Sequence, residues 1–231
     1  MELRRRSKLA DGFAAIRANL PVLLVVFAFN GALVGLAYIL RSKRPPVPKV
    51  DVVFVFDTTS SMSGEIRGMV RAARDFAAEL ATTGSDFRVG AVTFGDEIRE
   101  AQPMTDDVGA VRRFFGGLDA DGGGDTPEDL LLAGMAAIES MEWRRDAKPY
   151  MVFITDAPFH RTSRLGHTFD QLRQAASARG VTVYVAAIPE VSEYTSWPAE
   201  TGGKFYDIHA TSRFDMVVVS IGKSIAGSLS Q

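Results

Sequence analysis

Three runs of almost entirely apolar residues constrain the fold of this chain more than any other feature. They lie at residues 50–57 (VDVVFVFD), 150–155 (YMVFIT) and 181–188 (VTVYVAAI). A strand covered on one face alternates apolar and polar residues, whereas a parallel strand with helices on both faces is apolar almost throughout. The runs therefore predict a doubly wound α/β fold, in which helices flank a mostly parallel sheet.

Segments with helical periodicity separate these runs, as a doubly wound fold requires. Residues 63–83 carry an apolar side chain every three or four positions, Val70 among them. The segments predicted to be helices are 63–83, 108–118, 128–141, 168–179 and 214–229. Further strands are predicted at 87–94, 98–102 and 204–207. We expect one globular domain at residues 50–231.

A second feature lies ahead of this domain, where residues 18–40 contain no charged side chain. A helix of this length spans about 34 Å, which is enough for a hydrocarbon core of about 30 Å. No small-residue cleavage site follows it, so we expect an uncleaved transmembrane helix at 18–41. A basic segment at 1–17 precedes this helix, and a Pro-rich linker at 42–49 follows it.

The flanks and small residues of this helix lead to two further expectations. Lys and Arg lie on both sides with a small excess before the span, which favours a cytoplasmic N-terminus and a periplasmic or extracellular domain. Gly31 and Gly35 form a G-x-x-x-G spacing that lets helix backbones approach closely, although the spacing also arises by chance. The 20 Arg against 6 Lys, with abundant Ala, favour a GC-rich bacterial genome.

Composition narrows the chemistry of the domain. The chain has no cysteine, which excludes disulfides, thiolate metal sites and a cysteine nucleophile. Its three histidines have no pair at the i, i+4 spacing of helical metal ligands, so a His-rich transition-metal site is not expected. Residues 50–231 carry 26 acidic and 17 basic side chains, which argues against nucleic acid as a partner.

Oxygen-bearing side chains follow the predicted parallel strands. Asp57, Thr59 and Ser61 come after the first strand, Asp156 comes after the second, and the loop 122–129 (GGGDTPED) lies between them in the chain. Because the carboxyl ends of parallel strands share one edge of a sheet, these groups are expected to converge there. Hard oxygen ligands select Mg²⁺, Mn²⁺ or Ca²⁺. Two hydroxyls among few carboxylates leave the cation electrophilic enough to accept an outside carboxylate.

The motifs D-x-T-x-S, GGGDTPED and FITDAP, in this order, resemble the von Willebrand factor A (vWA) domain and its metal-ion-dependent adhesion site (MIDAS). The resemblance covers about residues 50–230. It implies that Asp57, Thr59 and Ser61 form the first metal loop and that Asp156 lies on the third. It also implies cell adhesion or another protein–protein interaction, in which an Asp or Glu of the partner completes the coordination of the cation.

The sequence allows more than one second-loop ligand and more than one function. The second-loop ligand is a Thr in many members of the family and a Glu in others. We therefore rank Thr126 first as the second-loop ligand, then Glu128, then Asp125. The alternative function is a scaffold subunit of a membrane complex with a minor or regulatory metal site. A phosphatase-like enzyme with Asp57 as nucleophile is disfavoured, because Thr59 stands where that chemistry needs a second acid. We therefore expect a binding module and no catalytic residue.

Overall fold

The computed structural model describes residues 47–123, 126–210 and 213–229. The predicted transmembrane helix with Gly31 and Gly35, and Asp125 of the second loop, lie outside the described residues. Among the helices that the structure does describe, none combines the length and apolar character needed to cross a membrane.

A single sheet runs through the described part of the domain, with six strands in the order β3-β2-β1-β4-β5-β6. Its strands are β1 (Lys49–Asp57), β2 (Asp86–Phe94), β3 (Ile98–Thr105), β4 (Ala147–Thr155), β5 (Thr182–Ala187) and β6 (Phe205–Asp207). All neighbours are parallel except β2 and β3, which a tight turn joins as an antiparallel pair at the edge. The prediction of a mostly parallel α/β sheet is confirmed.

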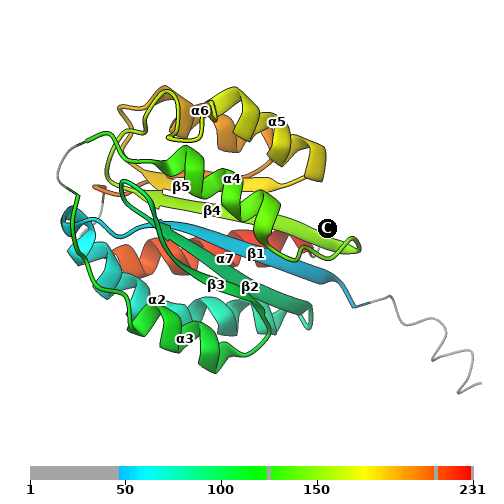
Figure 1. The fold of residues 1–231 in the computed structure, drawn as a ribbon. Helices are drawn as coiled ribbons and strands as arrows, with labels where there is room; N and C mark the ends of the chain where they lie inside the picture. The colour runs from blue at the N-terminus through cyan, green and yellow to red at the C-terminus, as the bar shows by residue number, and fades with distance from the viewer. Residues whose placement is uncertain (1–46, 124–125, 211–212, 230–231) are drawn as a thin grey trace, which may run out of the picture. The chain divides into compact units, whose positions relative to one another are not determined.

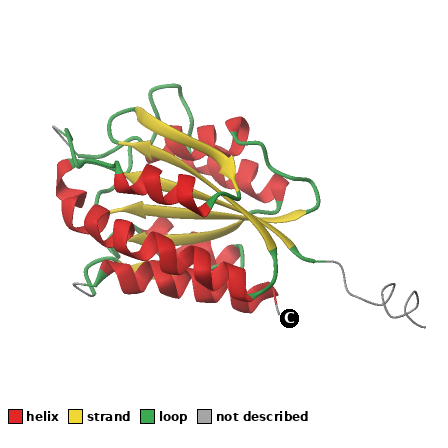
Figure 2. Cartoon of the chain, turned by 90° about the horizontal axis from the view of Figure 1, so that it is seen from below, coloured by secondary structure: helices red, strands yellow, loops and turns green. Residues whose placement is uncertain are grey.

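Helices cover both faces of this sheet (Figure 1). One layer contains α2 (Ser63–Thr82), α3 (Val108–Gly116) and α7 (Phe214–Leu229), and Figure 2 looks at the sheet from their side. The other layer contains α4 (Leu130–Ser140), α5 (Phe169–Arg179) and α6 (Ser192–Glu200). Phe54 and Phe56 of β1 pack toward the first layer, while Val53 and Val55 pack toward the second. Burial on both faces explains why β1 is apolar at every position from Val52 to Phe56.

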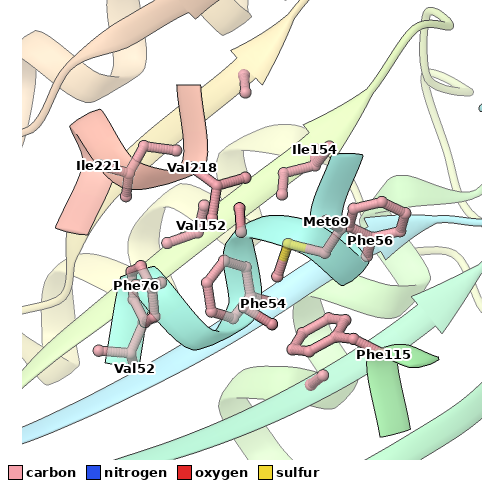
Figure 3. Packing of buried hydrophobic residues seen from close by; sticks show 14 of the residues in the cluster. Val52, Phe54, Phe56, Met69, Phe76, Phe115, Val152, Ile154, Val218 and Ile221 are labelled. Carbon is pink, nitrogen blue, oxygen red and sulfur yellow. The ribbon is translucent and has the colours of Figure 1, made fainter. Parts of the chain in front are cut away.

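Aromatic packing fixes the first layer against β1 (Figure 3). The ring of Phe54 meets Phe76 of α2 at 5.1 Å between centroids and Phe115 of α3 at 5.5 Å, both edge-on. Such pairs contribute about 0.5–1.5 kcal/mol each beyond the area they bury. The β1–α2 connection, which carries the first predicted metal loop, therefore leaves a rigidly packed strand and enters a rigidly packed helix.

Two features of the helices differ from the sequence prediction. Helix α6 was not predicted, because its segment contains Pro198 and lacks a regular apolar repeat. Its stability comes from tertiary packing, in which Tyr194 and Trp197 are buried against the second face of the sheet. In α2 the predicted core residue Val70 is 43% exposed, while Met69 and Ala73 face the core.

Candidate metal centre

The loops after β1 and β4 leave the sheet side by side. These strands are parallel neighbours, and Phe56 pairs with Ile154, so that Asp57 and Thr155 are the next residues along. The chain continues from Asp57 through a single 3₁₀ turn, Ser60–Met62, directly into α2. The loops after β1 and β4 therefore start side by side at one edge of the sheet.

A continuous chain of hydrogen bonds joins the four predicted ligands from these two loops. The backbone N–H and hydroxyl of Thr59 both donate to Oδ1 of Asp57, at 2.9 and 2.7 Å. The hydroxyls of Thr59 and Ser61 lie 3.1 Å apart, and Ser61 donates to Oδ1 of Asp156 at 3.0 Å. The structure therefore brings Asp57, Thr59, Ser61 and Asp156 together, as the sequence spacing predicts.

Asp57 is the most deeply placed member of this group, with no exposed surface. Burial raises the pKa of its carboxyl above the ordinary 3.8, and hydrogen bonds from Thr155 and Thr59 offset only part of that rise. The negative charge of Asp156 raises the pKa of Asp57 further. Among the described residues, no Lys, Arg or His forms an ion pair with Asp57. The site thus contains a desolvated carboxylate whose charge is stabilised by hydroxyl and amide dipoles alone.

The second loop approaches the first through Gly123. A Cβ placed at this glycine would lie 2.8 Å from Cβ of Thr59 and 3.5 Å from Oε1 of Glu128. Gly123 also has φ of +79°, so both space and backbone conformation require glycine here. Glu128 is 2% exposed, whereas Thr126, ranked first as the second-loop ligand, is exposed.

The start of α4 corrects one prediction. Glu128 was expected to begin the helix, but it forms a parallel bridge with Phe159 of the third loop, and α4 begins at Leu130. Asp129 is the N-cap of α4, where its carboxylate accepts from the N–H of Leu132 at 3.2 Å. A capping carboxylate satisfies a helix N–H only from outside the helix, so Asp129 sets the boundary one residue after Glu128.

Comparison with known proteins identifies the family of this chain. A model of the von Willebrand factor type A domain matches residues 51–201, which is about two thirds of the chain. The chain belongs to this family. Domains of the vWA family often mediate protein–protein interactions and are generally not enzymes. The matched residues include Asp57, Thr59, Ser61, the loop 122–129 and Asp156.

Two individual proteins are similar to this vWA domain. The alpha-protein kinase vwkA of Dictyostelium discoideum is 30% identical over 121 residues, 49% of this chain and 19% of the kinase. The chain thus spans about a fifth of that relative's length. A crystal structure of an aerotolerance-related membrane protein from Bacteroides fragilis, with multiple mutations to serine, superimposes with a TM-score of 0.55. It covers 77% of this chain and 99% of that protein at 14% identity, which shows the fold alone.

The donor set of the vWA domain suits a hard cation. The hydrogen-bonded side chains of the two loops offer two carboxylates and two hydroxyls. Within the described residues, no three His, Cys, Asp or Glu side chains cluster in a way that could hold a metal. Sequence reasoning missed Thr155, whose hydroxyl donates to Oδ2 of Asp57 at 2.7 Å. Its position as the last residue of β4, next to a predicted ligand, is the signal that identifies it.

Proposed function

We propose that this vWA domain binds a protein partner through one divalent cation, Mg²⁺ or its substitutes Mn²⁺ and Ca²⁺, held at Asp57, Thr59, Ser61 and Asp156. The observation that carries the proposal is the hydrogen-bonded chain linking these four side chains across two loops. The proposal extends the family assignment, which by itself leaves cation dependence open. An acidic side chain of the partner would complete the coordination, because two hydroxyls among the ligands leave the cation only partly neutralised.

The residues present fit such a cation. A buried carboxylate without a counter-charge is costly, and a bound divalent ion supplies the missing positive charge. The site contains oxygen ligands only, which is the preference of Mg²⁺. Thr155 donates to Oδ2 of Asp57 and Thr59 donates to Oδ1, so the two threonines orient the carboxylate that would hold the cation. Nothing in this arrangement requires bond-making chemistry, so we propose a binding module and not an enzyme.

Calorimetry on the full chain in detergent micelles tests the cation site. Mn²⁺ and Mg²⁺ should bind one per chain, and Asp57→Ala should abolish the heat of binding while the circular dichroism spectrum persists. The matched control is Asp146→Ala at the opposite end of the sheet, where an exposed carboxylate pairs with Lys49. Undiminished binding in Asp57→Ala, or none in the wild type, would refute the proposal.

The second-loop ligand is settled by two further variants. Thr126→Val removes an exposed hydroxyl, and Glu128→Gln removes the charge of a buried carboxylate while keeping its shape. The residue whose change weakens Mn²⁺ binding is the ligand. Glu128 is buried beside Gly123, and its backbone N–H donates to Pro158 of the third loop at 3.0 Å, whereas Thr126 keeps the acid count of the site at two.

We propose that the domain is attached to a membrane, with the N-terminus cytoplasmic and the domain periplasmic or extracellular. Support comes from the uncharged stretch 18–40 and the basic excess before it. The structural neighbour from Bacteroides fragilis is itself described as a membrane protein. Protease added to intact spheroplasts should digest the domain. Protection until lysis would reverse the orientation.

The alternative function is a scaffold subunit held in a membrane complex by helix contacts at Gly31 and Gly35. It is favoured by the G-x-x-x-G spacing, which supports close backbone packing in lipid. A membrane-helix association assay on residues 15–45 should lose its signal in Gly31→Leu and Gly35→Leu. A pull-down from membranes with Mg²⁺ and again with a chelator separates the two functions, because only the cation-dependent partner is released by chelation.

A further inference from the structure

Arg99 reaches from the sheet edge into the loops of the candidate metal centre. It lies near the start of β3, and its Nη1 donates to the carbonyl of Thr58 in the first loop at 3.1 Å. The same nitrogen donates to the carbonyl of Asp121, where the second loop begins. A direct backbone bond also joins these loops, because Asp121 N–H donates to Thr58 at 3.1 Å. One side chain thus bonds to both loops at the point where they meet.

Two glycines make room for this guanidinium. A Cβ placed at Gly95 would lie 2.7 Å from Nη2 of Arg99, and a Cβ at Gly122 would lie 2.7 Å from the same atom. Real Cβ atoms essentially never approach within 3.0 Å. Gly122 also needs glycine for its φ of +66°, whereas Gly95 is not among the residues with positive φ. At Gly95, therefore, the absence of a side chain makes room for the guanidinium of Arg99.

The contact is transmitted to the predicted ligands through the second loop. The carbonyl of Gly122 accepts from both the N–H and the hydroxyl of Ser60, at 3.1 and 2.8 Å. The next residue, Gly123, packs against Thr59. Ser60 lies between Thr59 and Ser61, so the two hydroxyl ligands flank the residue that the second loop holds.

We propose that Arg99 is a positioning residue of the metal centre, which clamps the second loop onto the first and so fixes the hydroxyls of Thr59 and Ser61 for the cation. The role rests on the proposed function. Two effects of Arg99 oppose each other, since its positive charge repels a divalent cation while its hydrogen bonds order the ligands. We expect the ordering of the ligands to outweigh the repulsion of the cation, so every change that disturbs Arg99 should weaken cation binding.

Charge and position are separated by four variants. Arg99→Gln removes both the charge and the guanidinium that bonds to the two loops. Arg99→Lys keeps the charge but replaces the planar guanidinium by a compact ammonium group. Gly95→Ala keeps Arg99 entire but places a methyl group where its guanidinium lies, and the flexible end of the arginine is what must move. The double variant Gly95→Ala/Arg99→Gln tests whether Gly95 acts through Arg99. Gly116→Ala is the control, because nothing lies within 4 Å of its Cβ position.

The measurement is Mn²⁺ affinity by calorimetry on the full chain. Supporting residues of metal sites typically change affinity by about 10- to 100-fold, so Arg99→Gln should weaken binding at least about tenfold. Arg99→Lys and Gly95→Ala should weaken binding by a smaller factor, and Gly116→Ala should not change it. In the double variant Gly95→Ala should add almost nothing, which is the non-additivity expected of two changes that act on one contact.

Hydrogen exchange in the metal-free protein supplies a second readout. The amides of Ser60 and Asp121 should exchange faster in Arg99→Gln and Gly95→Ala than in Gly116→Ala, while the amides of β1 stay protected. If Arg99→Gln does not fold, Gly95→Ala carries the test alone. Equal or tighter Mn²⁺ binding in the folded Arg99→Gln and Gly95→Ala variants would overturn the positioning role and leave the proposed function standing. Absence of Mn²⁺ binding in the wild type would overturn both.

Discussion

The two ends of β1 carry two aspartates in opposite electrostatic settings. Asp51 and Asp57 are both fully buried on the same strand. Arg88 donates to Asp51 at 2.9 and 3.2 Å, and Arg144 donates to it through its backbone N–H and its guanidinium. Burial alone would raise the pKa of Asp51, but the bonds and charges of the two arginines outweigh it and lower the pKa. The pKa of Asp57 is raised.

The difference separates a structural carboxylate from one available to a ligand. At the amino end of the sheet, Arg144 also bonds to Val50 and Asp86, so the ion cluster ties β1, β2 and the loop before β4 together. Its charges balance inside the protein. At the carboxyl end, the described residues provide dipoles and no counter-charge for Asp57. Burial of a charge without a partner is rare in a part of the fold that serves stability alone, and the imbalance is the reason for testing the proposed cation at this end.

The largest expected effect comes from breaking the balanced end. Asp51→Asn leaves Arg88 and Arg144 facing an amide, and removing one partner of a buried ion pair typically costs about 3–5 kcal/mol. We expect the unfolding free energy to fall by about 3 kcal/mol, because both arginines keep some contact with water. Urea unfolding measures it. Asp146→Asn, which breaks an exposed pair with Lys49, is the control and should change little. An equal response of the two variants would show that the cluster at Asp51 is not structural.

The corresponding change at the other end should behave in the opposite way. Asp57→Asn keeps an acceptor for the N–H of Thr59 and removes an uncompensated charge, so the metal-free protein should lose no stability and gain at most about 1–2 kcal/mol. Added Mg²⁺ should stabilise the wild type by about 2.7 kcal/mol at 100 times its dissociation constant, and should not stabilise Asp57→Asn. Thermal melts with Mg²⁺ and with a chelator compare them. A strong loss of metal-free stability in Asp57→Asn would place Asp57 with Asp51 as a structural residue.

Sequence reasoning predicted the two ends unequally. The strand that carries both aspartates was evident from its apolar run, and so was the cluster after it, because Asp57, Thr59 and Ser61 are close in sequence. The ion cluster at Asp51 was not predicted, because its partners Arg88 and Arg144 lie 37 and 93 positions away in the sequence. Arg99 was missed for the same reason. Contacts between distant segments leave no local pattern, whereas strand ends and turn motifs do.

A smaller effect is expected from the residue that holds the far oxygen of Asp57. Thr155→Val keeps the shape of the side chain and removes the hydroxyl that donates to Oδ2 at 2.7 Å. Support of this kind is typically worth about a tenfold change in metal affinity, or about 1.4 kcal/mol, so Mn²⁺ should still bind, but more weakly. Thr201→Val is the control, because its hydroxyl accepts from the N–H of Val183 and donates to Pro198 near the start of β5, at the opposite end of the sheet. Equal Mn²⁺ affinities in the two variants would remove the role of Thr155.

The smallest expected effect is on the pH dependence of stability, where the two aspartates should have opposite signs. The pKa of Asp51 is lowered in the folded state, so its contribution to stability is present above 3.8 and is lost as pH falls through the folded pKa. The pKa of Asp57 is raised, so its contribution is present below 3.8 and is lost as pH rises from there through the folded pKa.

Urea unfolding of the metal-free protein between about pH 3 and about pH 7 separates these contributions. Relative to wild type, Asp57→Asn should lose less stability as pH rises above 3.8, because an amide has no proton to release. The effect is small, since the hydrogen bonds of Thr155 and Thr59 already offset part of the rise in pKa. Saturating Mg²⁺ should remove the difference in slope by stabilising the ionised carboxylate. Parallel pH profiles of wild type and Asp57→Asn without metal would mean that folding leaves the pKa of Asp57 unshifted, so that its carboxylate carries no net cost of burial for a cation to relieve.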